Sequence, residues 1–181
     1  AFSTDKKLLP IYLFTGPDGS VWVGHPDRLL HIQGDRVDDF PLPIRSVFPQ
    51  TDVVFDAAGN LFVSTRKQIF TLSAAAQQKP TGAAFELFYT FAQEGIIGST
   101  KMLVDRGGLL WIGTNGFGVR KHNPGDHHFH HLAPNRSMRR ILPDSRGRIW
   151  AWQKGVFYHL GETDNQQLLK VSTDLDLLQH D

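Results

Sequence analysis

Apolar residues in this chain recur in short alternating runs, and no segment keeps the period of about 3.6 residues that marks an amphipathic helix. In residues 85–91, for example, an apolar side chain occupies every second position, as a half-buried strand requires. Four mostly hydrophobic runs stand out as innermost strands buried on both faces; they are Ile11–Phe14, Val53–Phe55, Met102–Val104 and Ile141–Leu142. The pattern predicts an all-β protein with little helix.

One nine-residue pattern follows each of these runs. It begins with Asp, has Gly three residues later, and then places an aromatic residue between two apolar ones, D-x-x-G-x-φ-[WF]-φ-[small]. The copies are 16–24, 56–64, 105–113 and 144–152, with Gly16 in place of Asp in the first and Trp152 in place of the small residue in the last. The shared glycines are 40, 49 and 39 residues apart, which matches the period of about 40–50 residues of a four-stranded β-propeller blade.

Each part of the pattern has a structural role. The Asp can accept hydrogen bonds from backbone N–H groups of a turn, and the Gly can adopt the positive φ that closes it. The aromatic residue of the following strand then packs between neighbouring blades. A further strand is expected soon after each turn, at 29–32, 68–72, 119–122 and 156–160.

We therefore predict a β-propeller segment of about four four-stranded blades, near residues 8–42, 43–92, 98–133 and 137–173. A β-sandwich would also show turns and alternation, but it does not require one pattern four times. Residues 174–181 resemble the first strand and turn Asp of a further blade, because Asp181 follows Asp144 by 37 residues. We expect a piece of a larger, seven-bladed propeller, whose open edges pair with the remaining blades of the same protein or with another copy.

Composition narrows the possible functions. The net charge of +1 gives no overall field that would recruit nucleic acid or anionic lipid. The absence of cysteine excludes a disulfide scaffold and a cysteine-based metal site. No apolar run approaches the roughly 20 residues of a membrane span, so we expect no direct membrane insertion by this segment.

The third copy, read from Val104 to Val119, resembles the two-component regulator propeller repeat, which reads roughly D-x-x-G-x-L-W-I-G-T before a glycine-rich turn. The similarity is good in the fourth copy and looser in the first two. The resemblance implies the periplasmic sensor domain of a hybrid two-component sensor histidine kinase, whose membrane span, kinase and regulator lie elsewhere. Such a domain would bind a small extracellular ligand, with an oligosaccharide expected, and signal across the membrane.

The first copy, from Gly16 to Val23, is also similar to repeats of the streptogramin lyase-like propellers, which are enzymes. That family uses a metal and a catalytic His on one propeller face, and no motif here places such a His. No nucleophile–base pair, phosphate-binding loop or metal triad stands out, so we expect no catalytic residue, no cofactor and no enzymatic role in this segment. A structural protein-interaction propeller is the third alternative.

Trp152 is the best candidate ligand residue, because a sugar ring can stack on an exposed aromatic face. Gln153 and Lys154 stand beside it and can donate hydrogen bonds. Packing of the Trp152 ring against a neighbouring blade is the commoner alternative. Weaker candidates lie on corresponding connections of the other blades; they are Asn115, Arg66 and Arg45.

A basic run, Arg136 to Arg148, contains five arginines that can recognise a carboxylate or sulfate group. Propeller topology places inter-blade connections on one face and the Asp-Gly turns on the opposite face. Arg136 and Arg139 therefore belong to the expected ligand face, whereas Arg146 and Arg148 flank a turn. The five arginines are not expected to form one patch.

Residues 126–131 read D-H-H-F-H-H. Two imidazoles at alternate positions of a strand share a face and can bind a transition metal. If Phe129 fills the apolar position, His128 and His130 lie together on the other face. A third ligand cannot be placed, and a solvated strand rich in His is the simpler interpretation. We predict no metal site, with these two histidines as weak candidates.

Overall fold

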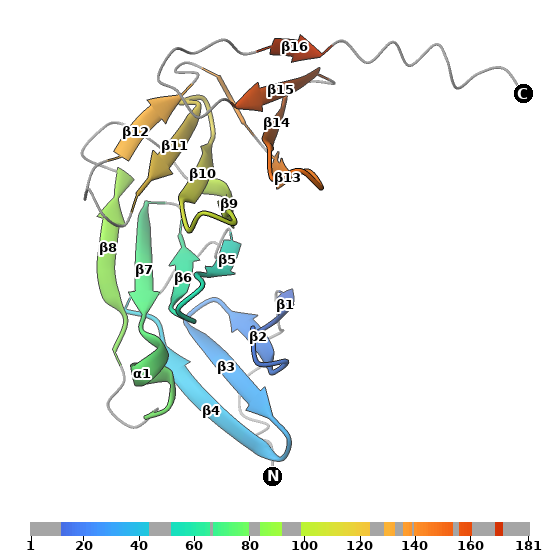
Figure 1. Cartoon of the computed structure of the whole chain (residues 1–181). Coiled ribbons are helices and arrows are strands. Elements are labelled where there is room, and N and C mark those ends of the chain that lie inside the picture. The colour runs from blue at the N-terminus through green and yellow to red at the C-terminus, as the bar shows by residue number, and fades with distance from the viewer. Residues whose placement is uncertain are drawn as a thin grey trace, which may run out of the picture. The chain divides into compact units, whose positions relative to one another are not determined.

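The computed structural model describes residues 12–43, 52–65, 67–79, 84–91, 99–123, 129–132, 136–138, 140–153, 156–160 and 169–171. These residues form four antiparallel sheets of four strands, and each strand within a sheet pairs with the next one along the chain (Figure 1). The prediction of an all-β fold with little helix is confirmed. The chain divides into two compact units, Ala1–Thr90 and Phe91–Asp181, and each contains two sheets.

The first unit holds the sheets of the first two repeats. The first sheet consists of β1 (Tyr12–Thr15), β2 (Val21–His25), β3 (Arg28–Gln33) and β4 (Arg36–Pro41). The second consists of β5 (Asp52–Phe55), β6 (Leu61–Ser64), β7 (Gln68–Leu72) and β8 (Glu86–Thr90). A single turn of helix, α1 (Ala74–Gln77), begins after Ser73, whose hydroxyl accepts a hydrogen bond from the Ala76 N–H.

The second unit holds the sheets of the last two repeats. The third sheet consists of β9 (Ser99–Val104), β10 (Leu110–Thr114), β11 (Val119–His122) and β12 (Phe129–Leu132). The fourth consists of β13 (Arg140–Pro143), β14 (Ile149–Gln153), β15 (Val156–Leu160) and β16 (Leu169–Val171). Residues 174–181, the predicted start of a further blade, lie outside the described residues.

The turn between the first two strands of the third sheet is built around Asp105. Its Oδ1 accepts hydrogen bonds from the backbone N–H groups of Gly107 and Leu109 at 2.9 and 3.0 Å. Its Oδ2 accepts the indole N–H of Trp111 at 2.7 Å. Asp144 makes the corresponding three contacts in the fourth sheet, and the Gly of the pattern has φ between 79° and 82° in all four copies. The Asp therefore closes the turn as predicted, and it also anchors the aromatic ring.

The core of each unit lies between its two sheets. In the first unit, Trp22 is 1% exposed and belongs to one buried cluster with Leu61 and Val63 of the second sheet. In the second unit, Trp111 is 2% exposed and clusters with Ile149 and other residues of the fourth sheet. Packing of the pattern's aromatic residue between neighbouring sheets is thus confirmed for Trp22 and Trp111, whereas Phe62 and Trp150 are half-buried and lie outside these two clusters.

The first strand of each sheet differs from the prediction, because these strands are not buried on both faces. Leu13 of β1 is 68% exposed and Leu142 of β13 is 40% exposed, while β5 is half-buried throughout. The reason is that alternate side chains of a strand point to opposite sheet faces. Leu13 and Leu142 lie on faces that remain exposed.

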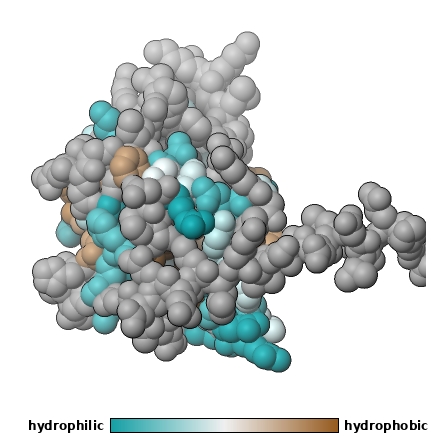
Figure 2. Space-filling model, turned by 90° about the horizontal axis from the view of Figure 1, so that it is seen from above, coloured by the Kyte–Doolittle hydropathy of each residue, from teal (hydrophilic) through white to brown (hydrophobic). Residues whose placement is uncertain are grey.

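Most of the coloured surface in Figure 2 is hydrophilic, and the smaller apolar patches lie mainly towards the margin of that view. A few large apolar side chains of the described chain are nevertheless more than a third exposed; they are Leu13, Val21, Val37, Leu87, Phe117 and Leu142. The first three belong to the first sheet.

Candidate functional site

The segment between the third and fourth sheets is fixed to the hairpin that joins β10 and β11. The Gly118 N–H donates to the carbonyl oxygen of Arg136 at 2.5 Å, and the Met138 N–H donates to the carbonyl oxygen of Thr114 at 3.0 Å. The Met138 side chain is fully buried. Residues 136–138 are therefore held in a defined position at this end of the second unit.

Two polar side chains meet at the same place. The Ser137 hydroxyl donates to Oδ1 of Asn115 at 2.8 Å. That contact uses the amide oxygen of Asn115 and leaves its NH₂ group without a partner among the described residues. We call Asn115, Arg136 and Ser137 the loop-end cluster.

Arg136 contributes a pre-oriented cation to this cluster. Its guanidinium carbon lies 4.9 Å from the ring centre of Tyr158, which is 8% exposed. Stacking on a fixed ring restricts the plane of the guanidinium but leaves the N–H groups along its edge available. Within the described chain these N–H groups have no carboxylate or carbonyl partner. The loop-end cluster thus offers several unused donors, which suits an anionic or hydroxyl-rich ligand.

Trp152 lies at the same end of the fourth sheet, opposite Arg140 on β13 and Phe157 on β15. The corresponding residue of the first sheet is Gly24, which is paired with Tyr12. A side chain at Gly24 would collide with the Tyr12 ring. In the fourth sheet Arg140 replaces that ring, so a large indole can occupy the position.

The Trp152 ring is half-buried and lies outside the buried cluster of its unit. Because paired residues of an antiparallel sheet share a face, the exposed Arg140 side chain stands beside this indole. Gln153 follows at the end of β14 and is also half-buried. An aromatic face next to a cation can accept a sugar ring with a negatively charged substituent.

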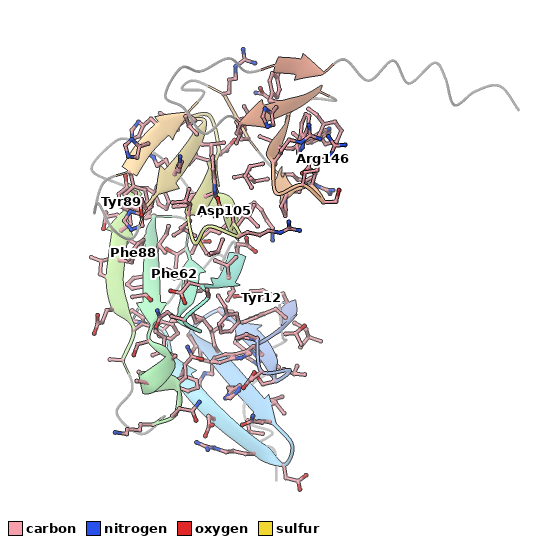
Figure 3. All side chains as sticks on the ribbon, in the orientation of Figure 1. Tyr12, Phe62, Phe88, Tyr89, Asp105 and Arg146 are labelled. Atoms are coloured by element: carbon pink, nitrogen blue, oxygen red, sulfur yellow. The ribbon has the colours of Figure 1, made fainter. Side chains whose placement is uncertain are left out.

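Arg146 and Arg148 lie at the opposite end of the fourth sheet. Arg146 is in the Asp144 turn, which Figure 3 shows together with the Asp105 turn of the third sheet. Nε of Arg148 lies 2.6 Å from Oδ2 of Asp144. The indole N–H of Trp150, and then Arg148, lower the pKa of Asp144. Arg146 and Arg148 both contact Asp144 and belong to its turn. The described arginines of the basic run therefore lie at two opposite ends of the strands.

The structure describes about half of the candidate residues. Asn115 and Arg136 are brought together through Ser137, and Trp152 and Gln153 lie at the same end of the strands. The candidates outside the described residues are Lys154, Arg139, Arg66, Arg45 and His128.

Sequence reasoning missed three contributors to this region. No local pattern in the sequence indicated Ser137 or Tyr158. Ser137 contacts Asn115 and Tyr158 contacts Arg136, and the two residues of each pair are 22 positions apart in the sequence. Arg140 belonged to the basic run, but only the register of β13 against β14 places it beside Trp152. A register argument from the repeated pattern could have found that pair.

The His-rich segment gives no metal centre in the part of the chain that the structure describes, where no three His, Asp or Glu side chains gather. His130 on β12 pairs with Lys121, and a neighbouring ammonium group does not favour a bound cation. His131 contacts the buried Arg120. Phe129 stacks on His122 with ring centres 4.6 Å apart, which places it on the opposite side of the strand from His130.

Solved structures with the same architecture identify the fold. Virginiamycin B lyase from Staphylococcus aureus superposes with a TM-score of 0.71 and 14% identity, over 96% of this chain and 58% of that chain. The extracellular domain of a putative hybrid two-component system from B. thetaiotaomicron gives 0.69 and 14%, over 94% and 26%. The fold is that of a β-propeller. A second such extracellular domain from the same organism gives 0.51 and 14%, over 87% and 29%.

These similarities identify the fold of the chain but do not assign it to a family. No family model matches the sequence, and neither does any curated protein. The chain spans about half of the lyase and about a quarter of the extracellular domains. The neighbours include the family that the third repeat resembles, together with the lyases that the first repeat resembles. Among the described residues, no helix is long and apolar enough to cross a membrane.

Proposed function

We propose that this propeller segment is the ligand-sensing part of a periplasmic two-component sensor. It binds a small extracellular ligand, an oligosaccharide, and passes a conformational signal towards the membrane, where the remainder of the sensor, including its kinase, is located. The observation that carries the proposal is the loop-end cluster, in which Arg136 is fixed and stacked yet has unused donors. The similarity to extracellular domains of putative hybrid two-component systems supports the periplasmic location.

The chemistry of the region fits a sugar carrying an anionic group. The edge of the Arg136 guanidinium can hold a carboxylate or sulfate with two parallel hydrogen bonds. The free NH₂ group of Asn115 can donate to a sugar hydroxyl beside it. Trp152, at the same end of the fourth sheet, offers a ring face for stacking.

Titration calorimetry of the 181-residue protein with neutral and uronic-acid oligosaccharides tests this function. Loss of a bidentate charged contact costs about 1.5–3 kcal/mol, so Arg136→Gln should weaken binding of the acidic ligand roughly tenfold or more. Arg136→Lys keeps the charge but loses the planar geometry, and it should recover only part of the affinity.

Arg146→Gln is the matched control, because it removes the same charge at the opposite end of the fourth sheet. It should leave affinity unchanged. Absence of binding by any oligosaccharide, or equal losses in the Arg136 and Arg146 variants, would refute the proposed site.

A lyase-like enzyme is the main alternative, since virginiamycin B lyase shares the fold. Incubation with a streptogramin B antibiotic and a divalent cation, followed by mass spectrometry, distinguishes the two. Metal-dependent turnover would favour the enzyme, and ligand binding without turnover would favour the sensor. A stable protein partner with no small ligand would favour a structural interaction module.

A further inference from the structure

A second cation lies near the loop-end cluster, towards the start of β9. Lys101 is exposed, and it is paired with Gly113 of β10. Two positions further along β9, Leu103 is paired with Trp111, and both contribute to the buried cluster between the third and fourth sheets. Because alternate residues of a strand share a face, the Lys101 side chain lies on the face that the third sheet turns towards the fourth.

Arg136 lies over the same buried cluster, in the connection between the two sheets. Its guanidinium stacks on Tyr158, which is a member of the cluster. The connection is bonded to the end of β10, because the Met138 N–H donates to the carbonyl oxygen of Thr114. Thr114 directly follows the residue with which Lys101 is paired. The two cations therefore flank the same end of β10, within reach of one short oligosaccharide.

The backbone around this pair of cations carries no acidic side chain. Residues 114–118 of the hairpin and residues 136–138 of the connection are all described, and none of them is Asp or Glu. Arg140 follows on β13 and adds positive charge at the same end of the fourth sheet. In such a local field, each further anionic group of a ligand meets a cation, so a ligand with more than one negative charge is favoured.

The corresponding end of the first unit differs in charge. The position of Lys101, opposite the small residue of the repeated pattern, is occupied by Tyr12 in the first sheet. Arg28 lies at the same end of β3, but its guanidinium lies 3.2 Å from Asp27 and 2.7 Å from Asp39. These carboxylates neutralise it. The first unit therefore has a tyrosine and a neutralised arginine at this end, where the second unit has two cations beside one buried cluster.

We propose that the ligand of this site carries two anionic groups, one bound by Arg136 and the other by Lys101. The inference rests on the proposed sensor function and narrows its ligand to a diacidic oligosaccharide, with carboxylates or sulfates on separate sugar units. The planar edge of the Arg136 guanidinium holds one group in a fixed orientation. The Lys101 ammonium is a point charge on a flexible stem, so it adapts to the position of the second group. Lys101 thus selects diacidic over monoacidic ligands.

Titration calorimetry of the 181-residue protein with two matched ligands tests the proposal. One ligand is a trisaccharide with a uronic acid at each end, and the other is the same trisaccharide with one carboxylate reduced to an alcohol. The unmodified protein should bind the diacid about three- to tenfold more tightly, which is the range expected for one further, partly screened ion pair. Added salt should reduce this preference, because it screens exposed charges.

Three lysine variants assign the preference to one side chain. Lys101→Gln should remove most of the preference for the diacid and leave affinity for the monoacid within about twofold of the unmodified value. Lys101→Arg keeps the charge and should retain the preference. Lys79→Gln is the matched control, because Lys79 is an exposed lysine of the first unit that follows α1, and it should change neither affinity. Circular dichroism confirms that each variant is folded.

The two ligands also separate failure of this inference from failure of the proposed function. Equal affinity of the unmodified protein for both ligands, or equal effects of Lys101→Gln and Lys79→Gln, would overturn the second anionic contact and leave the sensor function standing. Equal weakening of both ligands by Lys101→Gln would overturn it as well, because Lys101 would then bind the single anionic group that both ligands share. Binding of no oligosaccharide at all would refute the proposed function and this inference with it.

Discussion

The turn of the first repeat and the turn of the third hold a tryptophan at the same position by different means. In the third, the carboxylate of Asp105 accepts the indole N–H of Trp111 directly. In the first, Gly16 replaces the Asp, and the indole N–H of Trp22 donates to the Ser20 hydroxyl at 3.2 Å.

In the first turn, the carboxylate of Asp18 takes over part of the role of the missing Asp. Oδ1 of Asp18 accepts hydrogen bonds from both the backbone N–H and the hydroxyl of Ser20, at 3.0 and 2.5 Å. The Ser20 hydroxyl lowers the pKa of Asp18. The comparison shows that a relay of two side chains, Asp18 and Ser20, can replace a single Asp in holding the tryptophan of a turn.

The largest expected loss of stability comes from removing Trp22 or Trp111, the tryptophans held by these two turns. Trp22→Ala and Trp111→Ala should each lower the free energy of unfolding by about 3–5 kcal/mol, because each creates a large cavity between two sheets. Trp150→Ala should cost less, because its ring is half-buried. Chemical denaturation measures all three. Equal losses at Trp111 and Trp150 would contradict this ranking.

A smaller effect should follow from restoring the Asp of the pattern in the first repeat. A Cβ at Gly16 would lie 2.5 Å from the Ser20 hydroxyl and 2.7 Å from the Asp18 carboxylate. Gly16→Asp should therefore destabilise the protein, by about 1–3 kcal/mol as in other overpacked sites. The thermal midpoint measures this change, with Ala57→Asp at an exposed turn position of the second repeat as a control. A rise in the midpoint would show that the two turn designs are interchangeable.

The smallest expected effect is on the free energy of unfolding at acidic pH. A carboxyl group whose pKa is lowered on folding stabilises the protein fully above about pH 4, its unfolded value, and this contribution is lost as the pH falls through the lowered folded pKa. Trp150 and Arg148 cause the larger reduction of pKa at Asp144. Asp144→Asn should therefore flatten the loss of stability below about pH 4 more than Asp18→Asn does. Urea unfolding at a series of acidic pH values tests the order, and a larger effect of Asp18→Asn would reverse it.

The sequence by itself determined the repeated turn, the strands around it and the all-β class. The reason is that these features depend on neighbouring residues: Asp105 bonds to groups two, four and six positions away, and alternation of side chains is a property of each strand alone. The division of the basic run was also predictable, because Arg148 lies only four residues from Asp144.

Only the tertiary structure decided which faces are covered and which polar groups meet. Val21 and Leu61 occupy equivalent apolar positions in their repeats, but Val21 is 40% exposed and Leu61 is fully buried in the cluster that contains Trp22. Asn115, Arg136 and Tyr158 come together across tens of residues through backbone contacts between a hairpin and a connection. Such contacts depend on how sheets pack, and no short stretch of sequence encodes that packing.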